Sequence, residues 1–356
     1  MTVTRPDEPP STIVKYYPLK ELIVARAKEF FREPEAIFWV YVFPVLLMFG
    51  LGVAFRGGEV EVHVDVVAGS EADTAARSLK SVDGFRVEVV AIEEARARYA
   101  AGKVDIIVEP SRGGYRYLYD ASRTGAEAAK IRVNDVLQAA AGREDRISST
   151  SDLITEPGSR YIDWLIPGLM GMNIMGGGLW GLGFVTVDLR VRKLLKRYVA
   201  TPMRRSDFLL ALMSSRLFFL VPEMVLIIAV GHYAFGLEVQ GNLVAVAALI
   251  LVGAICFAGI GLLVACRAEK IETVSGLMNL VMLPMWLLSG IFFSSERFPE
   301  SMQPFVQALP LTQLNNGLRG LILEGSSLTE QWMPLLLLSG YGVLAFFLAL
   351  TWFKWK

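Results

Sequence analysis

Hydrophobic residues in this chain form long blocks, and polar segments separate one block from the next. The first block, residues 37–55, holds no charged residue and is about 19 residues long, which is enough for a helix to cross a hydrocarbon core of about 30 Å. Five further blocks of similar length follow: residues 164–187, 212–235, 243–266, 273–293 and 333–353. The pattern predicts an α-helical polytopic membrane protein with about six transmembrane helices.

The segment between the first two blocks, residues 56–160, has a different period. Its Val60, Val62, Val64 and Val66 alternate with polar residues, which is typical of a half-buried strand. Further strands are expected at residues 85–90, 104–108 and 115–119, and helices at residues 71–80, 92–101 and 125–141. The sequence therefore predicts an α+β domain of about 100 residues inserted between the first and second spans. It shows no pattern of catalytic residues.

The chain up to residue 35 is expected to form a cytosolic amphipathic helix at the membrane surface. Within residues 17–32, apolar side chains recur at helical spacing and basic ones lie between them. An amphipathic helix packed against protein is the alternative. Because the first apolar block begins only after this charged stretch, we expect a retained first span at residues 36–55 instead of a cleaved signal peptide.

The distribution of Lys and Arg predicts the orientation of the chain. Basic residues gather before the first span, between the second and third, between the fourth and fifth, and at the C-terminus, whereas the connection 236–242 has none. Short basic segments remain in the cytosol, and six spans place all four on one side. Both termini are therefore expected in the cytoplasm of a multi-pass protein of the cytoplasmic (inner) membrane, with residues 56–160 extracytoplasmic. Residues 161–356 would form the remaining transmembrane domain.

Composition removes several classes of function. The chain is 53% hydrophobic and 20% charged with a net charge of zero, so no basic surface points to nucleic acid. Cys256 and Cys266 lie in one predicted helix, too far apart for a disulfide, and are interpreted as free buried thiols. The two histidines, His63 and His232, are distant in sequence, so no metal site is predicted.

The most informative polar segment follows the second span. It combines several basic residues with an apolar face, and the Thr201-Pro202 pair ends the predicted helix because proline lacks the amide proton. A compact cytosolic helix held between two spans could serve as a lever for a partner protein. Alternatively, it is a basic loop that binds lipid phosphates and only sets the topology.

This segment resembles a known family. The run from Leu195 to Met203, LKRYVATPM, is similar to the coupling-helix signature of ABC type-2 exporter permeases, which would span about residues 189–203 here. The residues that match the signature are Leu195, Arg197, Tyr198, Thr201 and Pro202. A second ordered set resembles the fifth span, a short outer segment and the entry to the sixth span of that family: Asn279, Pro284, Ser289, Gly290, Pro299, Pro310 and Arg319.

The large domain between the first two spans is similar to the multidrug-exporter branch of the family. The chain departs from the family pattern at two places. It has Lys193-Leu194-Leu195 where the family often has Gly-Thr-Leu, and Asn316 where an acidic residue often precedes the final arginine by three positions. The second departure removes the expected charge partner of Arg319.

The resemblance implies a mechanism. Two permease chains, identical or related, would dimerise among the membrane lipids, and each would dock its coupling helix on a separate nucleotide-binding ATPase subunit. ATP and Mg would bind that subunit, because this chain holds no Gly-x-x-x-x-Gly-Lys-Ser/Thr phosphate loop. The chain itself is expected to bind no cofactor and to catalyse no reaction. Its cargo would be hydrophobic or amphipathic molecules, drug-like or lipid-like, moved outward.

Three polar residues at membrane depth are candidates for the transport pathway or the dimer interface. Glu223 is the strongest, since an ionisable group there is costly and usually faces a cavity or a partner; Arg216 is a candidate neutralising group. Asn173 and Asn279 could equally form hydrogen bonds between helices. Two other classes of protein are weighed: an ion-coupled secondary transporter, which needs titratable residues on several spans, and a membrane-anchored ligand sensor or scaffold, which leaves the basic helix without a role.

Overall fold

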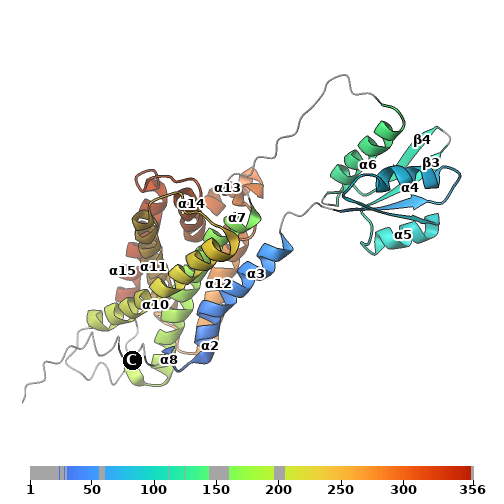
Figure 1. Ribbon diagram of the computed structural model, residues 1–356. Coiled ribbons are helices and arrows are strands. Elements are labelled where there is room, and N and C mark those ends of the chain that lie inside the picture. The colour runs from blue at the N-terminus through green and yellow to red at the C-terminus, as the bar shows by residue number, and fades with distance from the viewer. Residues whose placement is uncertain are drawn as a thin grey trace, which may run out of the picture. The chain divides into compact units, whose positions relative to one another are not determined.

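The computed structural model describes residues 24, 28, 30–55, 61–111, 113–123, 125–143, 160–195 and 205–353, with the side chains of residues 205–209 outside the description. The chain divides into two compact units, Gly57–Ile154 and the rest (Figure 1). Within the described residues, the larger unit has six helices long and apolar enough to span a membrane, and the smaller one has a four-stranded sheet. The predicted fold class, a helical membrane protein with about six spans and an inserted α+β unit, is confirmed.

The first span, Pro34–Ala54, contains a π-helical turn. It consists of α2 (Pro34–Ile37), the π-helix η1 (Phe38–Val42) and α3 (Phe43–Ala54). Pro44 lies two residues after the wide turn, and its ring would clash with the carbonyl of Val40 in a regular α-helix. The π-turn relieves that clash and keeps the span continuous.

The second span, Tyr161–Val191, has the same construction. It runs through α7 (Tyr161–Gly178), the π-helix η2 (Leu179–Phe184) and α8 (Val185–Val191). Its glycines allow another helix to approach closely, as small residues do in membranes. A Cβ atom on Gly178 would lie 2.5 Å from the carbonyl carbon of Phe257, and one on Gly261 would overlap the carbonyl oxygen of Gly178. The second span therefore packs at short range against the segment that holds Phe257 and Gly261.

Four more spans complete the bundle: α10 (Arg205–Phe235), α11 (Leu243–Ala265), α12 (Ile271–Leu288) and α15 (Trp332–Trp352). The α11 helix forms much of the core, and it is packed closely on α15 because Gly259 faces the carbonyl of Gly342. Cys256 and Cys266 are buried free thiols, as predicted. The first and third spans are joined by the Tyr41 hydroxyl, which donates to the carbonyl of Phe219 at 3.2 Å.

The fifth span ends earlier than its hydropathy suggests. Residues 273–293 were the predicted helix, but α12 stops at Leu288 and the chain turns at Gly290, whose φ of 71° is readily adopted only by glycine. Short helices follow: η3 (Ser295–Arg297), η4 (Glu300–Met302), α13 (Gln303–Ala308) and α14 (Pro310–Ile322). Almost all of α14 is buried.

The smaller unit is a sheet in the order β2-β1-β3-β4, where only β4 is antiparallel to its neighbour. Its strands are β1 (Val62–Val67), β2 (Phe85–Val90), β3 (Ile106–Ser111) and β4 (Gly114–Leu118). Its helices are α4 (Ala72–Lys80), α5 (Ile92–Ala100) and α6 (Ala126–Ala140). All six expected elements beyond β1 are present, with boundaries shifted by three residues or fewer. The alternating valines of β1 pack against α4 and α6.

The opposite face of β1 carries a buried charge. Asp65 is 1% exposed, and Arg98 of α5 lies 3.1 Å from its carboxylate (Nε to Oδ2) while also pairing with Glu88. Burial raises the pKa of Asp65, and the charge of Arg98 opposes that rise. The guanidinium therefore fastens α5 to the sheet.

Candidate functional site

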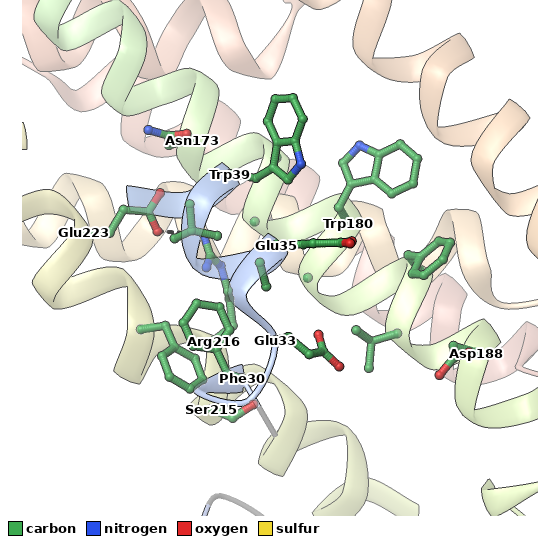
Figure 2. Close-up of a pocket in the computed structure, with 18 of the residues that line it drawn as sticks. Phe30, Glu33, Glu35, Trp39, Asn173, Trp180, Asp188, Ser215, Arg216 and Glu223 are labelled. Carbon is green, nitrogen blue, oxygen red and sulfur yellow. Dashed lines mark hydrogen bonds and ion pairs between the residues drawn. The ribbon is translucent and has the colours of Figure 1, made fainter. Parts of the chain in front are cut away.

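A cavity of about 970 Å³ lies between the first, second, third and fifth spans (Figure 2). Its lining combines seven aromatic side chains with a small set of charged groups. The aromatic ones are Phe30, Trp39, Phe43, Trp180, Phe184, Phe219 and Trp286. Concave, mainly apolar surfaces with few polar groups are typical of sites for small organic ligands.

A buried ion pair forms one side of the cavity. Arg216 and Glu223 both come from α10, two helical turns apart, and Arg216 Nη2 donates to Glu223 Oε2 at 2.9 Å. Their side chains are 11% and 1% exposed. The guanidinium lies against Gly177, where any Cβ atom would overlap it. The glycine of the second span thus makes room for the charge of the third, and Arg216 is the neutralising group of Glu223.

Asn173 lies in the cavity wall, whereas Asn279 does not. Asn173 comes from α7, and its Nδ2 is buried without a hydrogen-bond partner among the described residues. Because this nitrogen is itself buried, the Asn173 side chain would have to rotate before it could donate to a group inside the cavity. Asn279 is exposed on α12 and does not contact this space.

Aromatic pairs stiffen two walls of the cavity. The rings of Trp39 and Phe43 lie 4.9 Å apart on the first span, and those of Trp180 and Phe184 lie 5.6 Å apart on the second. Phe30 stacks on Phe219 at 4.2 Å, which closes the space between the first and third spans. Paired rings of this kind hold one another in place and present flat apolar surfaces.

Carboxylates gather where the first span begins and the second one ends. Glu33 and Glu35 lie at the start of the first span, and Asp188 lies one turn before the end of the second. Asp188 pairs with Arg192 at 2.9 Å. Glu33 and Glu35 form no ion pair with any other described residue. Neither residue stands out in the sequence, because both belong to the charged segment before the first span.

The residues matched to the coupling-helix signature are described only at their start. Leu195 is buried with Leu189, Leu262 and Phe353. Arg197, Tyr198, Thr201 and Pro202 lie outside the described residues, so their expected role stays a prediction.

Arg190 is a further residue whose place the sequence did not reveal. Its guanidinium donates to the carbonyls of Ala265 at 3.0 Å and Cys266 at 3.1 Å, and also to that of Ala268. These carbonyls lie at the end of α11 and just beyond it. In the sequence, Arg190 is one of several basic residues in a segment that is expected to be cytosolic, and nothing distinguishes it from the others.

The second matched set gathers around Arg319 of α14. Its side chain is 4% exposed, donates to the carbonyls of Gly290 and Trp164, and stacks on the Trp164 ring with Cζ 3.5 Å from the centroid. Ser289 is buried next to Gly290, and Asn315 Nδ2 donates to the carbonyl of Ser289 at 2.8 Å. Within the described residues Arg319 forms no ion pair with a carboxylate. Pro310 begins α14, while Pro284 and Pro299 are exposed on α12 and before η4.

Metal chemistry finds no support in the described part of the chain. No group of three or more His, Cys, Asp or Glu side chains there is placed to hold an ion.

The cavity can bind and orient an apolar molecule, and its charged groups can act on a polar end of that molecule.

Comparisons with known proteins agree with this arrangement. Residues 34–351 match the family model for ABC-2 family transporter proteins. A similar protein is ABC transporter G family member 20 of Dictyostelium discoideum, 24% identical over 204 residues, which are 56% of this chain. The match covers 28% of that relative's own length.

Proposed function

This chain belongs to the ABC-2 family of transporter proteins, and we propose that it is the membrane-spanning permease of an ATP-binding-cassette exporter. In this proposal it moves hydrophobic or amphipathic molecules, drug-like or lipid-like, outward across the cytoplasmic (inner) membrane. A separate nucleotide-binding subunit holds ATP and Mg, and a second permease chain, identical or related, completes the pathway. The observation that carries the proposal is the aromatic cavity of about 970 Å³ enclosed by four of the spans.

The second span connects this cavity to the proposed coupling helix. Asn173 and Trp180 in the cavity wall and Asp188 near its end belong to one continuous helix, Tyr161–Val191. The coupling segment, about residues 189–203, begins in the last turn of that helix. A displacement of the coupling segment by the ATPase would therefore move the wall that contacts the cargo.

The cavity would recognise cargo mainly by burying apolar surface. Transfer of apolar area out of water contributes about 25 cal/mol per Å², and seven aromatic side chains offer a large area. Polar groups in the lining are fewer than apolar ones: Asn173, the Arg216–Glu223 pair, and the charged side chains where the first span begins and the second one ends. Such a lining supports selection by size and apolarity more than by a fixed hydrogen-bond pattern.

The ion pair also favours ATP-driven export over ion-coupled transport. A secondary transporter needs titratable groups that gain and lose ions inside the membrane. Glu223 is already engaged by Arg216 at 2.9 Å, so its carboxylate does not offer an unoccupied site for a coupling ion. The ion-coupled alternative therefore has less support than the exporter.

Copurification and reconstitution test the proposal. The purified chain should bring an ATPase subunit with it, and the pair in liposomes should move a lipophilic fluorescent probe when ATP is present without any ion gradient. The R197E/Y198A variant should lose most of the ATPase association and stimulation, whereas R297E, a charge reversal at an exposed site outside the segment, should keep both. Equal stimulation by wild type and R197E/Y198A would show that residues 189–203 are not the coupling element.

Cysteine labelling tests the proposed orientation. Glu127 is exposed on α6 of the smaller unit, and Lys270 is exposed between the fourth and fifth spans. An impermeant maleimide should label E127C in intact cells and K270C only after permeabilisation, while the two native cysteines are buried and give little background. The reverse pattern would invert the topology.

A further inference from the structure

We propose that the cavity selects amphipathic organic cations among the molecules that could enter it. This inference rests on the proposed export function and adds the charge of the cargo. Four carboxylates line the cavity: Glu33, Glu35, Asp188 and Glu223. Among the residues that the structure describes, two guanidinium groups line it, those of Arg192 and Arg216.

Each guanidinium in the lining is already paired. Arg192 Nε lies 2.9 Å from Asp188 Oδ1, and Arg216 Nη2 lies 2.9 Å from Glu223 Oε2. Four carboxylates against two guanidiniums leave an excess of two negative charges. Those charges belong to Glu33 and Glu35, which form no ion pair within the described parts of the chain. A ligand of positive charge would complete the set, whereas an anionic ligand would meet repulsion.

The position of the two carboxylates suits the head of an amphiphile. Glu33 directly precedes the first span, which begins at Pro34, and Glu35 is the second residue of that span. Both thus lie at the membrane boundary, while Trp39 and Phe43 lie further along the same span. A molecule with a charged head and an apolar body can therefore place the head at Glu33 and Glu35 and the body between the rings.

Aromatic rings beside the carboxylates strengthen the preference for a cation. Trp39 lies four residues after Glu35, so the two side chains project from the same face of the helix. Trp180 and Trp286 contribute two more indoles from the second and fifth spans. Indole faces attract organic cations through the ring quadrupole, and the combination of rings and carboxylates is a recognised way to bind substituted ammonium groups.

Membrane electrostatics favour the same cargo. Cationic amphiphiles collect at the anionic cytoplasmic leaflet, which is the side assigned to the start of the first span by the distribution of basic residues. A mouth with negative charge at that boundary would draw them from the leaflet.

A matched pair of probes tests the inference. The cationic probe is trimethylammonium-diphenylhexatriene, and its neutral analogue carries a tert-butyl group of almost the same shape in place of the trimethylammonium. Binding of each is followed by fluorescence with the full-length purified protein in detergent, and transport is followed with the ATPase subunit in liposomes. Wild type should bind the cation more tightly than the neutral analogue.

The E33Q/E35Q variant should weaken binding of the cation about tenfold, which corresponds to about 1.4 kcal/mol, and change binding of the neutral analogue by less than twofold. The control E296Q/E300Q removes two exposed carboxylates outside the cavity and should change neither. Thermal unfolding of each variant shows whether the substitutions affect folding, and E35K offers a second variant that should reject the cation more strongly.

The outcomes separate the two proposals. Equal effects of E33Q/E35Q on both probes, or no effect on the cation, would overturn the charge selectivity and leave the exporter proposal standing. A preference for the cation in binding, without ATP-driven movement of either probe, would support the charge selectivity and count against export. Tighter binding of the neutral analogue by wild type would also refute the inference.

Discussion

Breaking the ion pair between Arg216 and Glu223 should destabilise the membrane-spanning unit by more than the loss of an ion pair at the protein surface would. Both side chains are largely buried, at 11% and 1% exposure, and their charged atoms are 2.9 Å apart. A lone charge left in such a place is strongly unfavourable, so removing both charges together should cost less than the sum of the two single removals. A comparison of the two single variants with the double variant therefore measures the free energy with which the two charges stabilise each other.

The geometry sets the magnitudes. Two unit charges at this distance attract by about 6 kcal/mol at an effective dielectric of about 20, and the cost of desolvating both groups offsets most of that. Glu223→Gln keeps a hydrogen-bond acceptor for Arg216, so we expect a loss of about 2 kcal/mol in the free energy of unfolding. Arg216→Gln leaves the more buried carboxylate alone and should cost about 3 kcal/mol. The double variant should cost about 3 kcal/mol instead of the sum of about 5, which is a coupling of about 2 kcal/mol.

Reversible unfolding in mixed detergent micelles, followed by circular dichroism, supplies the four free energies. Costs that add to within about 0.5 kcal/mol would refute the reasoning, because they would show that the two charges do not stabilise each other. The same variants inform on function. Glu223→Gln leaves the charge of Arg216 uncompensated beside the cargo and should lower ATP-driven transport more than it lowers stability. Unchanged transport would leave Glu223 with a structural role only.

Three further changes test other parts of the structure. Gly178→Ala should reduce the yield of monodisperse protein in size-exclusion chromatography because a Cβ atom would lie 2.5 Å from the neighbouring helix backbone, whereas Gly176→Ala, with nothing within 4 Å, should be tolerated. Arg98→Met should raise the pKa of Asp65 further above its unfolded value near 3.8. A carboxyl group with a raised pKa favours folding only while it is protonated, so the loss of stability in the variant should grow as the pH rises through the pKa of Asp65 in the folded state. Hydrogen exchange of the smaller unit at pH 4 and pH 7 measures this loss. Arg319→Lys should lower the unfolding temperature measurably, with a cost of about 2 kcal/mol, because lysine cannot both reach two carbonyls and stack on an indole; an unchanged temperature would count against that role.

Hydropathy alone was sufficient to find the spans, because each must present about 20 apolar residues to the lipid. It could not find where the fifth one ends. Residues 289–293 are as apolar as the helix before them, and the turn depends on the positive φ of Gly290 and on its carbonyl, which Arg319 binds from α14. It also missed α14, a buried helix whose Thr312, Asn315 and Arg319 face other protein instead of lipid.

The cavity was predictable only in part. Glu223 could be selected because an acidic residue inside an apolar block is unusual, and Asn173 for a similar reason. Glu33 and Glu35 gave no such signal, since acidic residues are ordinary in the segment before a span. Their significance depends on which side chains the fold brings opposite them, and periodicity along the chain carries no information about that.

The contacts of Arg190 have a mechanical consequence. Because its guanidinium binds the carbonyls at the end of α11, the C-terminal end of the second span cannot shift without the fourth span. The close packing of Gly259 on Gly342 couples the sixth span to the fourth in the same way. The first and third spans are fastened separately, through Tyr41 and Phe219. We therefore expect the second, fourth and sixth spans to move as one rigid group and the first and third spans as another, with the two groups separating along the cavity. Spin labels on α7 and α10 should then move apart during the ATPase cycle, while labels on α7 and α11 should keep a constant separation.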